Sequence, residues 1–335
     1  PVGVGYSTVQ VTVVDEGGLS ASFLISYAVS AAAAEPATTA FHTLASDASA
    51  AIALDSEWML VADDEGQALR VYPRALSGVP LEGFDFTADL GLAGSPDPDE
   101  VDIEGVTRIA DRVYWTGSLG NSRTGALRPN RNRVFATALL SSNGAHSLSY
   151  VDRYDFLRDD LLAWDAGNGH GLGANALGFV AAAAEGVEAD SPLGFNVEGL
   201  AVAPDAQTVW LAFRAPLLPR DSATPALLVP VLNFDALIAD GLPGSRVAGS
   251  ASFGAPVFLD LGGRSIRAIE RNAAGEYLLV AGPADYATDV PPSDFRAFLW
   301  DGNPASAPRY LPITLPALPV HGSYEAIVDF SADLL

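Results

Sequence analysis

Short apolar runs separated by turn residues recur along the chain, and almost none has the 3.6-residue spacing of an amphipathic helix. The exceptions are brief: we predict helices at 154–164, 176–184 and 234–238. A typical pair of runs lies at 101–106 and 112–117, with a turn between them. Two β-rich runs joined by a turn are typical of a hairpin, so the pattern predicts an all-β protein.

The paired runs form an internal repeat. Its unit is a small polar residue, an apolar residue, a charged residue, Gly or Ala, and another apolar residue, as in DIEGV at 102–106, NVEGL at 196–200 and SIRAI at 265–269. A weaker copy lies at 48–52 and a last one at 323–327. Adjacent strands repeated in this way are the sequence signature of a β-propeller. A jelly roll or sandwich is the alternative fold, which the repeat disfavours.

The spacing of the copies predicts six blades. The copies are centred, in order, on Ala50, Glu104, Glu198, Arg267 and Glu325. The gap between the second and third copies is wide enough for one more unit, whose strands we place at 133–137 and 147–151. Each unit is longer than the ~40–45 residues of a compact blade, so the loops must be elaborated.

Both ends of the chain bear on closure of the ring. The copy at 323–327 leaves room for little more than one inner strand, so its remaining strands have to come from elsewhere. Residues 1–30 contain two β-rich runs around an Asp-Glu-Gly-Gly turn and are the available donor. They also resemble the last two strands of the cadherin- or immunoglobulin-like modules of bacterial surface proteins. We therefore expect 1–30 to be either blade-closing strands or the tail of a preceding module, and 31–335 to be the propeller.

Composition narrows the classes of partner. The chain carries 41 acidic residues against 18 basic ones, all arginine, for a net charge of −23 and a pI near 4.2. Such a surface repels phosphate backbones and anionic lipid, which disfavours nucleic-acid binding. No apolar stretch reaches the ~18–20 residues of a membrane helix, so membrane insertion is not expected either.

The absence of cysteine removes disulfides, zinc–thiolate sites, iron–sulfur clusters and thiol catalysis together. The apolar stretch at 19–34 is not expected to be a signal peptide, because the first basic residue is Arg70. We expect a monomer that is secreted, periplasmic or on the surface of a bacterium.

The repeat also predicts a charged site on the propeller axis. The first strand of each blade lines the central channel, and residues two apart in a strand share a face. The charged positions should therefore meet at one mouth of the channel, where close carboxylates need a cation, an arginine or protons. The candidate ligands of a Ca²⁺ or other hard cation are Glu104, Glu198, Glu325, Asp102 and Asn196. The alternative is that the glutamates bond backbone N–H groups of the next blade and brace the ring.

Two acidic turns, at 63–66 and 95–102, are further cation candidates, although both also fit plain solvated loops. The arginines of 123–133 form the one local positive region. Guanidinium groups bind phosphate and carboxylate in a bidentate manner. The candidate anion-binding or substrate-binding residues are Arg128, Arg131, Arg214 and Arg267. The alternative is pairing with the protein's own excess of acid.

Nucleophile motifs such as Gly-x-Ser-x-Gly, a Walker loop or His-Glu-x-x-His are missing, so no catalytic residue is assigned. His170 and His321 lie in predicted loops near channel strands and are candidate general bases. A lone loop histidine is more often solvent-exposed, and that is the alternative for both.

The segments VDIEGVTRIADRVYWTGSLGNSRTGALRPNRNRVF, FNVEGLAVAPDAQTVWLAFRAPL and LGGRSIRAIERNAAGEYLLVAGP together resemble a family of uncharacterised bacterial β-propellers, a domain of unknown function, over residues 45–330. NVEGLAVAPD is also similar to the phytase-like esterase propellers. That resemblance implies a calcium-bearing channel mouth and hydrolysis of phosphorylated substrates. The chain departs from it in having no lysine, which phytase-type pockets use with arginine to hold phosphate.

Two functions are therefore expected from different classes. The first is a cation-stabilised binding or scaffold module that binds a small anionic molecule or a surface partner. The second is a metal-dependent hydrolase, a phosphatase or esterase, in which the glutamates hold the cation and arginines hold the anion. Whether the protein is an enzyme stays open at this point.

Overall fold

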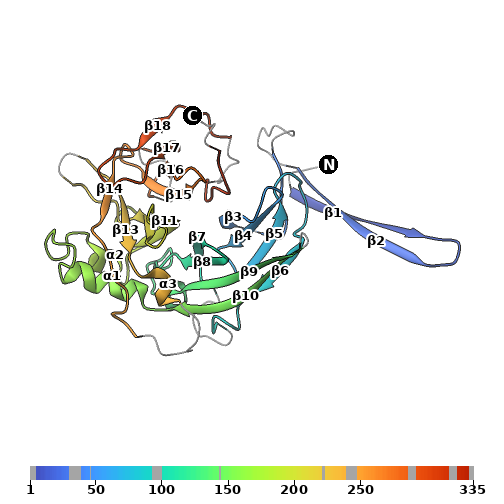
Figure 1. Ribbon diagram of the computed structural model, residues 1–335, viewed down its shortest axis with the longest axis horizontal. Coiled ribbons are helices and arrows are strands. Elements are labelled where there is room, and N and C mark those ends of the chain that lie inside the picture. Colours follow the sequence, from blue (N-terminus) through green and yellow to red (C-terminus); the bar gives the residue numbers. More distant parts are fainter. Residues whose placement is uncertain are drawn as a thin grey trace.

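A computed structural model describes residues 5–29, 39–45, 47–92, 100–142, 145–220, 223–238, 247–285, 292–316 and 323–331. Strands dominate it, which confirms the all-β class (Figure 1). The helices are short: α1 (Leu157–Ala166), α2 (Phe179–Ala182), α3 (Phe234–Leu237) and one 3₁₀ turn, Pro129–Asn132. The three predicted helical segments are thereby confirmed. No helix in the described part of the chain has the length and apolar character needed to cross a membrane.

Four antiparallel sheets of four strands follow one another along the chain and around a common centre (Figure 1). In each sheet the strands pair in chain order. The first two blades consist of β3 (Ala48–Ala53), β4 (Trp58–Asp63), β5 (Ala68–Pro73) and β6 (Glu82–Asp85), then β7 (Ile103–Ile109), β8 (Arg112–Gly117), β9 (Val134–Ser142) and β10 (Ala145–Tyr154). The next two consist of β11 (Asn196–Val202), β12 (Val209–Ala215), β13 (Ala226–Val231) and β14 (Val257–Leu259), then β15 (Ser265–Arg271), β16 (Tyr277–Gly282), β17 (Arg296–Trp300) and β18 (Arg309–Leu311).

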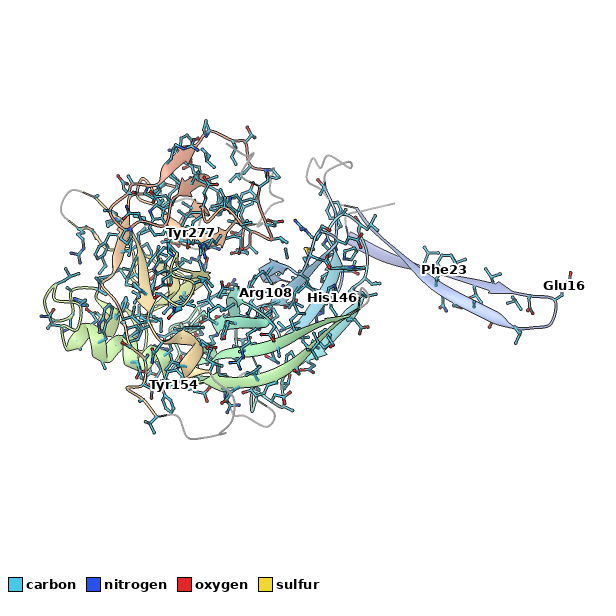
Figure 2. All side chains as sticks on the ribbon, in the orientation of Figure 1. Glu16, Phe23, Arg108, His146, Tyr154 and Tyr277 are labelled. Carbon is cyan, nitrogen blue, oxygen red and sulfur yellow. The ribbon has the colours of Figure 1, made fainter. Side chains whose placement is uncertain are left out.

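The first strands of neighbouring blades lie side by side: β3 contacts β7, β7 contacts β11, and β11 contacts β15. Apolar side chains fill the space between each pair of blades, and Trp115 and Trp300 are fully buried there. Tyr277 lies between the third and fourth blades, where its ring packs on Trp210 and its hydroxyl donates to the carbonyl of Val202 at 2.6 Å (Figure 2). Blades arranged around an axis and packed face to face confirm the β-propeller.

The described residues form four complete blades, and six are not shown. The predicted extra unit at 133–137 and 147–151 belongs to β9 and β10, the third and fourth strands of the second blade. The long gap before the third blade is instead taken up by α1, α2 and the loops around them. Chain length between inner strands therefore overstated the number of blades.

A fifth place on the ring is held by 323–330, an extended segment outside the strand ladders. On one side, Ala53 N donates to the carbonyl of Val328 at 3.2 Å, and the Val328 side chain packs on the apolar face of the first blade. On the other side, Phe330 packs against Leu278 and Leu311 of the fourth blade. The C-terminal segment thus joins the last blade to the first.

The N-terminal hairpin is a separate two-stranded sheet. β1 (Gly5–Val14) and β2 (Ser20–Val29) pair in one register without a bulge, and the turn is fastened by Asp15, whose side chain accepts a hydrogen bond from Leu19 N at 2.9 Å. The hairpin extends away from the blades and carries Phe23, 54% exposed, far from the core (Figures 1 and 2). Among the described residues neither strand pairs with a blade. Whether 1–30 complete a blade or end a preceding module stays a prediction.

Candidate functional site

A β-bulge occurs at the same place in each of the four inner strands. The register shifts between Ala48 and Ala50, Ile103 and Gly105, Val197 and Gly199, and Ile266 and Ala268. A bulge leaves one residue out of the ladder and redirects it. We call the residues that the bulges leave out the ring positions of the four blades. They are Ser49, Glu104, Glu198 and Arg267. The sequence alignment of the first copy was therefore wrong by one residue: its ring position is Ser49 and not Ala50.

In β7 and β11 a glycine follows the ring position, at a point where the inner strands of neighbouring blades come close together. A Cβ on Gly105 would lie 3.0 Å from the backbone nitrogen of Leu200 in the next blade, and a Cβ on Gly199 would lie 2.8 Å from Ile269 Cγ2. Each inner strand thus packs against the next one at this point, which is why the motif requires Gly or Ala.

Glu198 and Glu325 are neutralised by arginine. Glu198 Oε1 lies 2.8 Å from Arg214 Nη1, and its Oε2 lies 3.0 Å from Arg267 Nε in a charge contact without hydrogen-bond alignment. Arg267 Nη2 donates to both oxygens of Glu325, at 2.8 and 2.9 Å. Two of the three predicted axial ligands are therefore engaged by the protein itself.

Burial and the neighbouring charges shift the pKa values of Glu198 and Arg267. Burial raises the pKa of Glu198 to about 7, against the opposing effect of Arg267 and Arg214. Burial alone would lower the pKa of Arg267, but Glu198 and Glu325 raise it above its usual value. Arg267 therefore stays charged between the two glutamates.

Arg214 also binds Asp190, whose Oδ1 is 2.9 Å from Nη1, and its Nε donates to the carbonyl of Ala284 at 3.0 Å. Asn196, a predicted cation ligand, lies beside the same carboxylate, with its Nδ2 at 3.5 Å from Asp190 Oδ1. Asp190 could not be predicted from the repeat, since it lies in a loop outside it.

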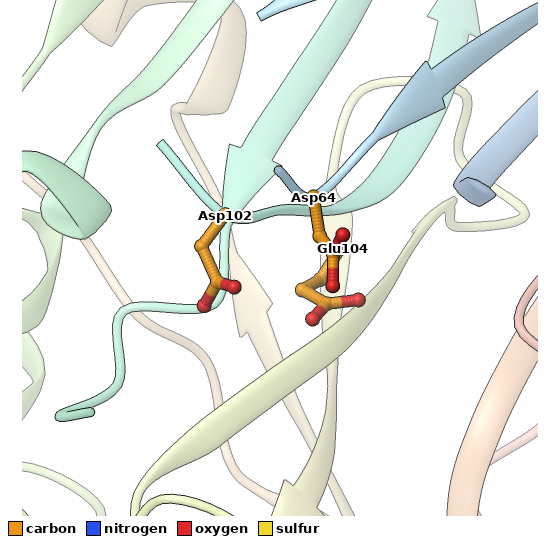
Figure 3. Close-up of side chains that lie close together, drawn as sticks. All are labelled: Asp64, Asp102 and Glu104. Carbon is orange, nitrogen blue, oxygen red and sulfur yellow. The ribbon is translucent and has the colours of Figure 1, made fainter. Parts of the chain in front are cut away.

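The third predicted glutamate has a different environment. Glu104 on β7, Asp102 just before that strand and Asp64 in the turn after β4 place carboxylate oxygens within 4.8 Å of one another (Figure 3). No ion pair joins Glu104 to an arginine among the described residues. Asp102 has one such partner, Arg131, at 2.8 Å, and Arg131 is shared with Glu100 at 2.6 Å. The cluster therefore has more negative charge than its one shared arginine can balance.

The excess of negative charge and the burial of the cluster raise the pKa values of its three carboxyl groups. Burial and the neighbouring carboxylates raise the pKa of Asp64 to about 8 and that of Glu104 well above its usual value. Burial also raises the pKa of Asp102 to about 6, against the effect of Arg131. Near neutral pH, these groups need either protons or a bound cation. Oxygens bound to one Ca²⁺ at 2.3–2.6 Å lie at most about 5 Å apart, so their spacing fits such an ion.

The channel itself is narrow. It is lined by the four inner strands and by 325–327, and its volume is about 20 Å³. A water molecule needs roughly 10–15 Å³ by the same measure. The channel thus has room for about one water or one ion, and an organic substrate does not fit inside it.

The other candidates are distributed away from this cluster. Three of the four predicted anion-binding arginines, at 131, 214 and 267, pair with the protein's own carboxylates, whereas Arg128 lies at the start of the 3₁₀ turn. Of the acidic run 95–102, the residues before Glu100 lie outside the described part, as does His321. The His170 side chain is fully buried, 3.0 Å from Asp165 Oδ1, so the expectation that it is solvent-exposed was wrong.

No protein-family profile and no curated protein matches the chain. Among solved structures, it is similar to the extracellular domain of a putative hybrid two-component system from B. thetaiotaomicron, at 10% identity and a TM-score of 0.27, over 90% of this chain and 32% of that one. It is also similar to a streptogramin B lyase, at 10% identity and 0.33, over 97% and 81% of the two chains.

A third similar structure is the β-propeller domain of Cps50 (Swd1) from Myceliophteria thermophila, at 6% identity and a TM-score of 0.26, over 76% of this chain and 70% of that one. The chain spans about a third of the length of the first of these proteins. At these scores the likeness adds nothing to the fold, which the four sheets establish.

Proposed function

We propose that this chain is a non-catalytic binding or scaffold module of a secreted, periplasmic or cell-surface bacterial protein, stabilised by one Ca²⁺ ion at Asp64, Asp102 and Glu104. The observation that carries the proposal is the imbalance of charge in this cluster. Three carboxylates lie together, and among the described residues one arginine, Arg131, is in contact with them and is shared with Glu100.

A hard divalent cation suits this cluster better than a further arginine does. Ca²⁺ takes six to eight oxygen ligands, and each carboxylate offers one or two of them. The space available in the adjoining channel fits a single ion and excludes a bulky cationic side chain. The ion would join the turn after β4 to the start of β7, and so the first blade to the second.

The arginines favour a non-catalytic role. In the hydrolase mechanism expected from the sequence, an arginine has to be free to hold the anionic substrate. Arg214 and Arg267 are buried and already paired with carboxylates. Releasing either one would remove one of the two arginines that balance the buried carboxylate of Glu198.

One contact supports the alternative function, a metal-dependent phosphatase or esterase. Arg131 Nη1 lies 2.8 Å from Asp102, so a guanidinium adjoins the proposed ion. In that mechanism the cation would activate a water and Arg131 would exchange Glu100 for the anionic substrate.

Thermal unfolding in EDTA and in Ca²⁺, with a phosphatase and esterase panel on the same samples, tests both functions. At a Ca²⁺ concentration a hundredfold above Kd, binding adds about 2.7 kcal/mol to the free energy of unfolding. We expect a Ca²⁺-dependent rise in Tm that is lost in Glu104→Gln and no turnover. Glu325→Gln is the matched control, because this ring glutamate pairs with Arg267 and should leave the Ca²⁺ response in place. Turnover that chelation abolishes would establish the hydrolase instead.

A further inference from the structure

A second cavity lies outside the propeller ring, between α1 and the segment 248–253. Its volume is about 510 Å³, compared with about 20 Å³ in the channel. Cavities of roughly 300–1,000 Å³ are the usual size of small-molecule sites. This one is unrelated to the proposed Ca²⁺ cluster and has its own chemistry.

Asp160 fixes the two walls of the cavity relative to each other. Its Oδ2 accepts hydrogen bonds from Ala251 N at 2.9 Å and from the Tyr154 hydroxyl at 2.5 Å, and its Oδ1 accepts one from Gly249 N. The helix and the facing segment are thus tied by a buried carboxylate. The cavity is therefore preformed.

One wall is an indole held in place by its neighbours. Gly169 lies so close that a Cβ there would be 2.1 Å from Trp164 Cδ1. The ring of His170, itself fixed by Asp165, meets the indole edge-on at 4.9 Å, and Phe253 packs on it at 5.1 Å. Trp164 and Phe253 therefore present a rigid aromatic surface to the cavity. In the described part of the chain the indole N–H has no hydrogen-bond partner.

In the described part of the chain, the charged residues that line the cavity are both acidic. They are Asp159 and Asp160. The neighbouring Arg158 points away, and donates to Asn121 Oδ1 at 2.8 Å and to the carbonyl of Ala183 at 2.7 Å. Asp159 is exposed and makes no hydrogen bond or salt bridge within the described residues. Its carboxylate is available to a ligand.

We propose that this cavity binds a small organic cation, with an ammonium or alkylated ammonium group against Trp164 and Phe253 and Asp159 as its counter-ion. Cations within about 6 Å of an indole face are attracted by the ring, and desolvation strengthens this contact. A carboxylate beside two aromatic rings favours a cation over an anion, and also over a neutral molecule of the same size.

Titration of the whole chain with tetramethylammonium chloride, against NaCl at equal ionic strength, tests the proposal by calorimetry. We expect saturable binding in the millimolar range, weakened at least tenfold by Trp164→Leu and about threefold to tenfold by Asp159→Asn. Asp111→Asn is the matched control, because this exposed aspartate lies at the turn between β7 and β8. Equal Tm values for the Asp159→Asn variant and the wild type would show that its effect on binding is not one of folding.

Two neutral probes complete the test. tert-Butanol has a similar shape without the charge, and methyl α-glucoside is a sugar that could stack on the indole. We expect binding of either to be at least tenfold weaker than that of tetramethylammonium. Absence of saturable tetramethylammonium binding, binding indifferent to Asp159→Asn and Trp164→Leu, or tighter binding of the glucoside would overturn the proposal.

Discussion

Inside the channel, the guanidinium of Arg267 lies between two carboxylates, with Nε 3.0 Å from Glu198 Oε2 and Nη2 2.8 Å from Glu325 Oε1. All four inner-strand ring positions lie at a bulge, which directs these side chains differently from the neighbouring ladder residues. Arg267 contacts both glutamates and Arg214 also contacts Glu198, whereas Glu104 lies beside two aspartates.

Replacing Arg267 by methionine should be strongly destabilising. Removal of one partner from a buried ion pair leaves an uncompensated charge and costs about 3–5 kcal/mol. Urea unfolding measures the loss directly. Arg296→Met is the control, because Arg296 is 44% exposed in its pair with Asp294 and such pairs contribute about 0–1 kcal/mol. Equal effects of the two variants would mean that Arg267 does not hold the axial carboxylates.

The pKa of Glu270, which also lines the channel, predicts that the stability of the protein depends on pH. Burial raises its pKa to about 8, and Asp329 acts in the same direction. A carboxyl whose pKa is higher in the folded state favours folding when protonated, so this stability is complete below about pH 4 and is lost as the pH rises through about 8. Unfolding of Glu270→Gln should therefore show a flatter pH profile, and the variant should be more stable than the wild type at pH 9. A variant less stable at pH 9 would contradict this.

At the scale of elements, the repeat of paired runs was enough to predict the propeller and its inner strands, and the three exceptions to that pattern predicted the short helices. Two features could not be predicted from the sequence. A bulge adds a residue without changing the pattern of apolar positions, so Ala50 was aligned where Ser49 belongs. Chain length does not distinguish a further blade from a helical insertion, so β9 and β10 were placed in a blade of their own.

Only part of the candidate cation site could be predicted from the sequence. The repeat identified Glu104 and Asp102, since both lie in or beside an inner strand. Asp64 belongs to a turn of another blade, and its approach to Glu104 depends on how neighbouring blades pack. The pairing of Arg214 with Glu198 depends instead on the register of β11 and β12 within one blade, which the bulge in β11 alters.

Close packing of inner strands predicts that Gly105→Ala is destabilising. The new Cβ would lie 2.9 Å from Thr116 Cγ2 and 3.0 Å from the Gly199 backbone, so blades would have to move apart. Overpacking of this kind costs about 1–3 kcal/mol. Gly66→Ala is the matched control, because nothing lies within 4 Å of a Cβ there and its effect should stay within about 0.5 kcal/mol. Chemical denaturation of the two variants decides whether the contact between blades is as tight as described.

Deletion of 1–38 tests the role of the N-terminal hairpin. β1 and β2 pair with each other and with no blade strand in the described residues, so the free energy of unfolding of the propeller should change by less than about 0.5 kcal/mol. Differential scanning calorimetry of the truncated and whole chains measures it. A large loss of stability would show that the hairpin completes the last blade.

At the scale of the whole molecule, the ring is closed by contacts and not by a covalent bond. The segment 323–330 bonds to β3 through Val328 and packs on the fourth blade through Phe330. The net charge of −23 adds a general repulsion that favours opening. A cation bound between the first two blades would reduce this repulsion where the carboxylates are most crowded.

Calorimetric titration of the chelated chain with Ca²⁺ tests the central claim most directly. The account predicts one site per chain, which Asp64→Asn weakens at least tenfold and Glu325→Gln leaves unchanged. Asp64→Asn removes one carboxylate from the cluster without changing the shape of the turn, so its loss of affinity would place the ion there. No saturable binding to the wild type, or equal binding by both variants, would contradict the account.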